Sequence, residues 1–372
     1  MSQVFRSRRP SPQPSPSSFW IWYYVAVLLA SILTWSYVRG YLSYKDYQRG
    51  DRAYKSGNCQ AAIAEFERVS ARWFPTDFQN LGRSAQSKKR QCKAFQKAIA
   101  RQESGQATRS LIAYNKLLAF SPHTALRSAI QKNAANLFTE TDSAKLTNPK
   151  LCAQLESFRR NQLLAIGSNH LPPLYQSCGK LYETQEKYSQ AAVIYGQFLN
   201  AYPKHELAPK TKEKLAHSII AEAKQQGAAT LLQPQQIGYT DSSYAVLEIQ
   251  NDSPTKMQLI FSGSETIIEE IEPCFDCKKY IGKGPESCPA RGPVGRYTLK
   301  PGQYNIVVKS ADEFRVTPYR GDWTLNPGTA YNQCFYLIQN PLEKQQQKTP
   351  MDSDSQTMPQ NDDRIPKGSF KF

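Results

Sequence analysis

The chain has 372 residues, of which 40% are hydrophobic and 21% are charged, and its formal net charge is +16. This length leaves room for two or three domains, and the hydrophobic content excludes a chain that is disordered throughout. The charge is concentrated, because residues 41–227 carry 28 Lys or Arg and 14 Asp or Glu, which gives 14 of the 16 excess positive charges. No run of basic residues interleaved with aromatic residues is present, so we expect no nucleic-acid partner.

The N-terminal segment predicts a leader followed by a membrane anchor. Residues 1–18 are rich in Pro and Ser, which is typical of a disordered leader. Residues 19–38 are uncharged, and the run is interrupted only by Ser31, Thr34 and Ser36. Twenty residues is about the length at which a helix crosses the hydrocarbon core, and Trp and Tyr gather at both ends as in interfacial belts. We predict a permanent single-pass transmembrane helix, with a cleaved signal peptide as the alternative.

The orientation of this anchor does not follow from its flanking charges. Arg6, Arg8 and Arg9 precede the apolar run, while Arg39 and Lys45 begin a second basic group after it. The chain has eight cysteines, which fits an oxidising compartment better than the cytosol. We therefore expect the soluble body to be extracytoplasmic.

A pattern of small and large residues at helical spacing runs from residue 175 to residue 203. Its members are Tyr175, Cys178, Gly179, Tyr182, Tyr188, Ala191, Tyr195, Phe198 and Pro203. The pattern resembles the tetratricopeptide repeat, a two-helix unit of about 34 residues. Such a unit needs neighbours to cover its apolar face, so the resemblance implies a helical solenoid and, for the family, protein or peptide recognition in a concave groove.

Two further copies of the pattern lie upstream, within a predicted helical array over residues 41–227. One contains Gly50, Ala53, Gly57, Ala62, Phe66 and Val69. A weaker one contains Ala94, Gly105, Ser110, Tyr114, Leu117 and Pro122, and its first helix lacks the small residue of the pattern. Residues 125–168 have helical periodicity but match poorly, which indicates a degenerate repeat or an inserted helical hairpin. Residues 206–226 predict a polar-faced helix that closes the stack.

The resemblance also implies which residues face a partner. In tetratricopeptide proteins the first helix of each repeat lines the groove, and the matching positions here are Tyr47, Tyr54, Lys55, Phe95, Gln102, Gln176 and Lys180. Tyrosines beside lysines suit an extended acidic peptide or a C-terminal peptide, since rings supply contact area and ammonium groups attract acids. Anionic lipid headgroups and a merely solvated basic surface remain alternatives.

After residue 227 the helical period gives way to alternation. Short strands are predicted at residues 244–250, 256–261, 265–271, 304–309 and 334–338. Strands of this length and spacing predict a small antiparallel β-sandwich over residues 228–341. Residues 342–372 predict a disordered tail.

The cysteines of the β region leave three alternatives open. Cys274, Cys277, Cys288 and Cys334 form two disulfides of unknown connectivity, hold a structural zinc ion, or remain free thiols. We favour disulfides, because the second half of a zinc motif is missing. The four cysteines of the helical region, Cys59, Cys92, Cys152 and Cys178, are expected to be core thiols.

No motif predicts catalysis, so the sequence predicts a binding protein. The four histidines lack metal-pair spacing and no phosphate-binding loop is present, so we expect no catalytic residue, metal or cofactor. We predict a membrane-anchored, non-enzymatic scaffold or assembly factor that binds a protein or peptide, with an acidic peptide as one candidate. The alternative is a structural spacer whose C-terminal β domain is the binding module.

Overall fold

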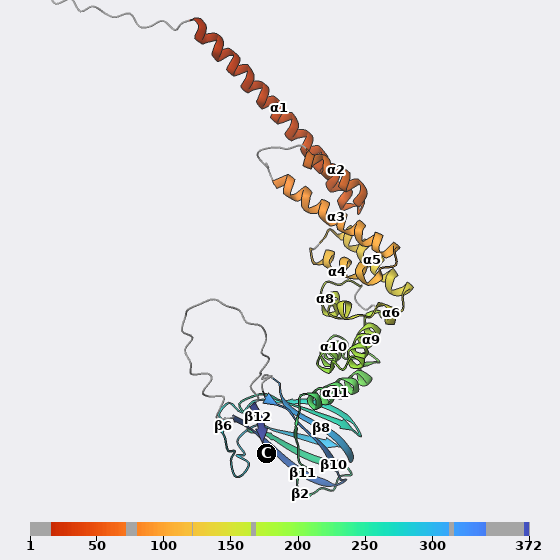
Figure 1. Cartoon of the computed structure of the whole chain (residues 1–372), viewed down its shortest axis with the longest axis vertical. Coiled ribbons are helices and arrows are strands. Elements are labelled where there is room, and N and C mark those ends of the chain that lie inside the picture. Colours follow the sequence, from red (N-terminus) through yellow and green to blue (C-terminus); the bar gives the residue numbers. More distant parts are fainter. Residues whose placement is uncertain are drawn as a thin grey trace, which may run out of the picture. The chain divides into compact units, whose positions relative to one another are not determined.

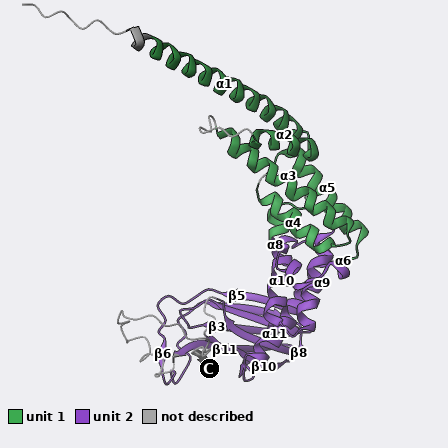
Figure 2. Cartoon of the chain, turned by 45° about the horizontal axis from the view of Figure 1, so that its top comes forward, with its two compact units in different colours: residues 1–142, 157–167 green, residues 143–156, 168–372 purple. Residues whose placement is uncertain are grey.

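The computed structural model describes residues 16–71, 80–120, 122–164, 169–311, 316–339 and 368–371 (Figure 1). The chain divides into two compact units. Unit 1 comprises residues 1–142 and 157–167, and unit 2 comprises residues 143–156 and 168–372 (Figure 2). The predicted leader, residues 1–18, lies mostly outside the described residues, as does most of the predicted tail.

Unit 1 is helical. Its helices are α1 (Pro16–Lys55), α2 (Cys59–Ala71), α3 (Leu81–Glu103), α4 (Ala107–Ala119) and α5 (Thr124–Glu140). Helix α8 (Leu155–Arg160) crosses the boundary between the units. Helix α1 is continuous over 40 residues, so the apolar run and the first helix of the first repeat are one element.

The same turn joins the two helices of three pairs. Gly57, Gly105 and Glu186 each have a φ between 55° and 79°, in the left-handed region, at the end of α1, α3 and α9 (Leu171–Thr184). The next residue in each turn donates its N–H to a carbonyl five residues back, in the bonds Asn58 to Ala53, Gln106 to Arg101 and Lys187 to Tyr182. This is the hydrogen-bond pattern of a Schellman motif. The three turns align the three repeats residue by residue.

A small residue on the first helix faces an aromatic ring of the second. A Cβ at Gly50 would lie 2.7 Å from the Phe66 ring, and one at Gly179 would lie 2.2 Å from the Tyr195 ring. The aligned residue of the middle repeat is Ala98, which is fully buried and whose carbonyl accepts the Ser110 hydroxyl at 2.8 Å. The sequence reading that this repeat lacks its small residue was wrong.

The described part of this segment, residues 125–164, does not form a further regular repeat, and residues 165–168 lie outside the described residues. After α5 come three short helices, α6 (Ser143–Leu146), α7 (Pro149–Cys152) and α8. Asn148 caps α7 by accepting the Leu151 N–H at 3.0 Å. A single long helix followed by short ones is closer to an irregular insertion than to the helical hairpin that the periodicity allowed.

Unit 2 continues with helices and then two sheets. Helices α9, α10 (Tyr188–Ala201) and α11 (Ala208–Gln225) precede the strands. The strands are β1 (Ala229–Thr230), β2 (Gln235–Tyr239), β3 (Ala245–Asn251), β4 (Met257–Gly263), β5 (Thr266–Ile271), β6 (Tyr280–Ile281), β7 (Val294–Leu299), β8 (Gly302–Ser310), β9 (Val316–Thr317), β10 (Tyr319–Leu325), β11 (Thr329–Gln339) and β12 (Gly368–Lys371).

The two sheets are mixed, not antiparallel as expected. The five-stranded sheet has the order β1-β10-β8-β4-β5, with β1 parallel to β10. The seven-stranded sheet has the order β7-β3-β11-β12-β9, and β2 and β6 also pair with β11. Strand β11 is parallel to β3 and antiparallel to β12, which lies within the predicted tail. All five strands predicted from the sequence are present, within a few residues of their predicted bounds.

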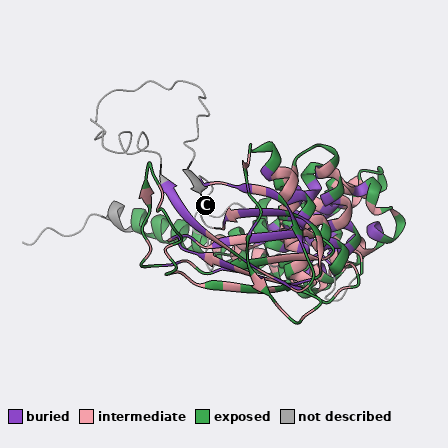
Figure 3. Ribbon diagram, turned by 90° about the horizontal axis from the view of Figure 1, so that it is seen from below, coloured by how far each residue is buried: buried purple, intermediate pink, exposed green. Residues whose placement is uncertain are grey.

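The central strands β8 and β4 of the five-stranded sheet are buried on both faces. Leu259 and Phe261 of β4 belong to a hydrophobic cluster shared with strands of the other sheet, whereas Ile260 between them packs with α11. Strand β8 repeats this arrangement with Val307 facing α11. Figure 3 shows buried residues concentrated along the strands. Runs of consecutive apolar residues, such as 259–261, are the expected sequence for a strand buried on both faces.

Helix α11 belongs to the array and to the β region at once. One side contacts α10, and another, with Ala216, Ile219 and Ala223, packs on the five-stranded sheet. The polar-faced closing helix predicted from the sequence was therefore only half right. It ends the helical series, but a sheet covers the face that was expected to be solvated.

The contact between Gly179 and Tyr195 predicts a strong local effect of one methyl group. Gly179→Ala should destabilise the α9–α10 pair by about 1–3 kcal/mol, because the added Cβ overpacks a fully buried ring. Gly196→Ala, on α10, meets no atom within 4 Å and should instead stabilise the helix by up to about 1 kcal/mol. Hydrogen exchange at the amides of α9 and α10 measures both effects. Equal exchange in the two variants would contradict this packing.

Candidate functional site

Helix α1 is long and apolar enough to cross a membrane. Its stretch from Trp20 to Lys55 contains a window of mean hydropathy 1.6, and none of that window is buried against the protein. Figure 3 shows this helix as exposed along its apolar part. Trp22 and Leu33 are 71% and 69% exposed. Such a surface on a helix of a water-soluble domain would be unfavourable, whereas lipid covers it without cost.

The polar groups of this segment are satisfied within the helix. Ser31 and Thr34 donate their hydroxyls to the carbonyls of Val27 and Ala30, both at 2.8 Å. Neither hydroxyl therefore needs an acceptor on a second helix, which is the condition that a lone helix in a lipid core would have to meet. At the C-terminal end of the run, the Arg39 guanidinium lies 4.4 Å from the centre of the Trp35 ring.

In unit 1, two of the predicted groove residues hold neighbouring first helices together. The Tyr47 hydroxyl lies 2.8 Å from the Ser84 hydroxyl, and the Tyr54 hydroxyl donates to Gln91 Oε1. Tyr54 also accepts the backbone N–H of His123 at 3.2 Å and is only 5% exposed. These tyrosines connect α1 to α3 and to the start of α5, and most of their surface is used in doing so.

A charged group between α1 and α3 reinforces this contact. Lys88 Nζ lies 2.5 Å from Asp51 Oδ1 and donates to the Tyr47 hydroxyl at 2.9 Å, while Lys55 reaches Asp51 Oδ2 at 2.8 Å. Burial raises the pKa of Asp51, but the hydrogen bonds from Lys55 and Lys88 outweigh it and leave that pKa below its ordinary 3.8. A lowered acid pKa means that the group stabilises the fold above about pH 3.8 and loses that contribution as the pH falls further.

In unit 2, the aligned residues bind α11 in the same way. Gln176 Nε2 donates to Thr211 Oγ1 at 2.5 Å, and the Ser218 hydroxyl donates to Glu183 Oε1 at 3.2 Å. Gln176 and Glu183 occupy the positions of Tyr47 and Tyr54 in the alignment given by the turns. Helix α11 therefore stands to α9 as α3 stands to α1, and it is the first helix of a repeat whose second helix is replaced by the sheet.

The remaining predicted groove residues divide between core and surface. Phe95 is 6% exposed and packs against the Tyr114 ring, whose hydroxyl donates to Gln102 Oε1 at 2.8 Å. Lys55 and Lys180 are exposed. Among the described residues, Lys180 has no recorded ion-pair partner. Partner binding by all seven residues stays a prediction, and the two lysines are the members with the most free surface.

The cysteines lie in four pairs at disulfide distance. Cys59 of α2 pairs with Cys92 of α3, and Cys152 of α7 pairs with Cys178 of α9. The expectation of core thiols at these four positions was wrong in one respect, since they are buried but paired. In the β region the pairs are Cys274–Cys277 and Cys288–Cys334, which supplies the connectivity that the sequence left open.

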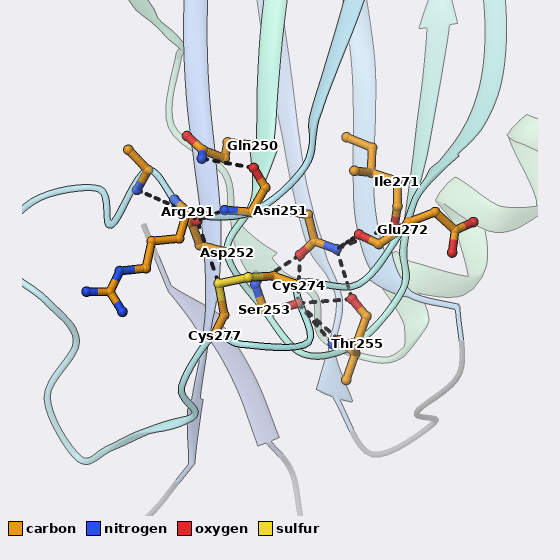
Figure 4. The surroundings of a disulfide bond; sticks show 12 residues. Gln250, Asn251, Asp252, Ser253, Thr255, Ile271, Glu272, Cys274, Cys277 and Arg291 are labelled. Carbon is orange, nitrogen blue, oxygen red and sulfur yellow. Dashed lines mark hydrogen bonds between the residues drawn. A yellow bond between two sulfur atoms is a disulfide. The ribbon is translucent and has the colours of Figure 1, made fainter.

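A buried carboxylate, Asp252, lies close to both cysteine pairs of the β region, and Figure 4 shows it beside the first of them, Cys274–Cys277. Asp252 is 1% exposed and accepts the backbone N–H groups of Ala290, Arg291 and Gly292 at 3.1, 2.8 and 2.7 Å. Its oxygens lie 3.9 Å from Cys277 Sγ and 3.5 Å from Cys288 Sγ. Three N–H donors fix the carboxylate, so it holds the loop after Cys288 against the end of β3.

The neighbouring Asn251 holds the other side of this loop cluster. Its Nδ2 donates to the carbonyls of Thr255 and Glu272, each at 2.9 Å, and its Oδ1 accepts the Ser253 hydroxyl at 2.7 Å. Asn251 is fully buried, so these bonds satisfy a side chain that would otherwise be costly. If the cysteines are reduced, Asp252, Cys288 and Cys334 form a possible metal-binding group, because their ligand atoms lie within 4.8 Å of one another.

Comparison with known proteins gives a weak likeness to helical repeats. No family model and no curated protein matches the sequence. Among solved structures, the chain is similar to nearly identical TPR-like repeats of a putative kinesin light chain from Podosopora anserina, with 14% identity and a TM-score of 0.20 over 50% of this chain and 88% of that chain. A variant of that protein gives 14% identity and a TM-score of 0.19 over the same shares. The repeat assignment therefore rests on the turns, contacts and bonds described above.

The cysteine pairing predicts four defined crosslinked peptides. With thiols trapped by alkylation before the membranes are solubilised, non-reducing mass spectrometry should find the pairs Cys59–Cys92, Cys152–Cys178, Cys274–Cys277 and Cys288–Cys334. A metal assay on the same sample should find no zinc. Alkylated cysteines throughout, or one zinc ion per chain, would overturn the pairing.

Proposed function

We propose that the chain is a single-pass membrane protein that acts as a non-enzymatic scaffold and binds a protein partner through its helical repeats. The observation that carries the proposal is the shared construction of the helix pairs. One turn joins all three pairs, and in the first and last pairs a glycine faces an aromatic ring and the first helix bonds the next first helix. Repeats built in this way present an extended surface that is suited to binding a partner. The absence of a recognised catalytic motif in the sequence supports the non-enzymatic part.

The membrane placement rests on α1, and the outward orientation rests on the cysteines. A helix with an exposed apolar surface and internally satisfied hydroxyls suits a lipid core. Eight cysteines in four pairs suit an oxidising compartment, where disulfides persist. In this proposal the two sheets of unit 2 pack as a sandwich, supported by the hydrophobic cluster to which both contribute.

The anchor predicts behaviour in alkaline extraction. The full-length chain should remain in the membrane pellet after a carbonate wash, because α1 is embedded in hydrocarbon. A variant with Val27→Arg and Ala30→Arg should shift toward the supernatant, since each buried Arg costs about 2.5–3.5 kcal/mol at the centre of a span. The control with Leu at both positions should stay in the pellet. Release of the wild-type chain would refute the anchor.

The repeat surface predicts which charges matter for capture of a partner. Lys55→Gln and Lys180→Gln should each weaken capture from native membranes several-fold and make it less sensitive to salt, because each removes an exposed charge at a predicted groove position. Lys210→Gln and Lys283→Gln, which are also exposed and remove the same charge, should have little effect.

A second candidate places binding in the β domain. Phe275, between the paired Cys274 and Cys277, is 86% exposed, and Tyr239 of β2 is 82% exposed. Exposed rings of this size are common at protein interfaces. If both groove variants capture the partner as the wild type does while Phe275→Ser or Tyr239→Ser abolishes capture, the array is a spacer and the β domain is the binding module.

A further inference from the structure

Helix α3 carries more positive charge than its surroundings neutralise. Of its eight charged residues, seven are basic and the eighth is Glu103. Lys88 pairs with Asp51 of α1, Lys93 pairs with Glu67 of α2 at 2.6 Å, and Lys89 donates to the Ser70 hydroxyl. Within the described residues no ion pair or hydrogen bond is recorded for the other four side chains, which we call the α3 ladder: Arg83, Arg90, Lys97 and Arg101.

The α3 ladder occupies one narrow face of the helix. At 100° per residue, its four members fall within an arc of about 40°. Arg83, Arg90 and Lys97 are exposed, and Arg101 is half-buried. Lys88, which pairs with α1, lies nearly opposite the ladder, and Lys89 and Lys93, which contact α2, lie to one side of it. The helix thus uses the charges that face its neighbours for packing and leaves the ladder without a partner among the described residues.

On an ordinary solvated helix face, acidic residues would stand between basic residues such as these. Glu placed four residues before a Lys or Arg stabilises a helix, whereas like charges at that spacing destabilise it by a few tenths of a kcal/mol. Lys97 and Arg101 have the unfavourable spacing, and no acid interrupts the ladder. The repulsion along this face is relieved when an anion binds to it.

The direction of α3 decides between a membrane and an extended partner. Tyr47 meets Ser84, Asp51 meets Lys88, and Tyr54 meets Gln91, so α3 runs parallel to α1 with a constant offset of 37 residues. Arg83 is therefore level with residue 46 of α1, and Arg101 lies 18 residues further along the same direction, beyond the end of α1 at Lys55. Measured from residue 38 at 1.5 Å per residue, the ladder begins roughly 12 Å beyond the apolar run and ends roughly 39 Å beyond it.

A bilayer at the end of the apolar run reaches only the first member of the ladder. The attraction of anionic headgroups decays within a Debye length of about 8 Å at physiological salt. A ladder directed away from the membrane instead matches a linear anion that lies along it. The steps between Arg83, Arg90 and Lys97 are about 10 Å each, which is the length of three residues of an extended peptide at about 3.3 Å per residue.

We propose that the α3 ladder binds an extended acidic segment of a partner protein, with Asp or Glu at about every third residue. Three of its four cations are arginines, whose planar guanidinium forms paired hydrogen bonds to a carboxylate. The proposal deepens the scaffold function and rests on it, since it names the chemistry of the partner and the helix that receives it. The site differs from the seven groove positions expected from the repeat family.

Binding of a defined peptide to the full-length chain in nanodiscs tests this proposal. The probe is a fluorescein-labelled peptide with Asp at every third position and Gly or Ser between, followed by anisotropy at low and at physiological salt. Arg90→Gln combined with Lys97→Gln should weaken binding on the order of tenfold and reduce its salt dependence. The control Lys283→Gln with Lys300→Gln removes the same charge from exposed positions of the β region and should bind as the wild type does.

The contrary outcomes are distinct. Equal binding of the peptide by the ladder variant and the wild type would overturn the proposal. Absence of peptide binding by the wild-type chain would also overturn it. Ladder-dependent binding to phosphatidylserine vesicles without peptide binding would assign the face to lipid and also overturn it. If the chain does not bind the peptide but still captures a partner from membranes, the ladder proposal fails and the scaffold function is retained. If the chain binds the peptide but captures no partner, the ladder proposal is supported and the scaffold function fails.

Discussion

The close approach of the two helices in each repeat is the constraint on which the helical part depends. Gly50 and Gly179 have no side chain where the rings of Phe66 and Tyr195 lie, and Ala98 holds the same position in the middle repeat. Large rings need a flat partner to be buried completely, and a small residue on the opposite helix supplies one. This close packing fixes the first helix of the pair against the second. Tyr47 of α1 and Gln176 of α9 then hydrogen-bond the first helix of the next repeat.

Helix α11 joins the stacked helices to the five-stranded sheet, because it packs against both. Its contacts with α9 through Thr211 and Ser218 are those of a first helix, yet the second helix that should cover it is missing. Ile260 and Val307, pointing out of the five-stranded sheet, occupy that place. Burial on both faces makes these strands continuous apolar runs, so the sheet gains a second hydrophobic layer and the helical series ends without an exposed apolar face.

The sequence predicted the repeats where contacts are local and failed where they cross repeats. Gly50 and Gly179 were recognisable because the small-to-large spacing lies within one helix pair. Ala98 was missed because the sequence pattern placed Ala94 in the first helix of this repeat. The left-handed turn at Gly105 aligns Ala98, and not Ala94, with Gly50. Cys59 and Cys92 belong to α2 and α3, so their pairing depends on stacking that no single repeat encodes. Tyr47 and Tyr54 also hydrogen-bond the next first helix, a contact between repeats that the sequence pattern did not indicate, and their predicted role toward a partner stays a prediction.

Continuity of α1 links the membrane segment to the chemistry of the surface. Because one helix runs from Pro16 to Lys55 without a break, the first repeat begins on the same axis as the candidate membrane span. Bonds from Tyr47, Asp51 and Tyr54 then fix α3 parallel to that axis. A flexible linker after the apolar run would allow any basic face to contact anionic headgroups. A continuous helix instead keeps each charge at a fixed distance from the end of the apolar run. If α1 crosses a membrane as proposed, the basic row on α3 extends away from the bilayer, which favours a protein segment over lipid headgroups as its ligand.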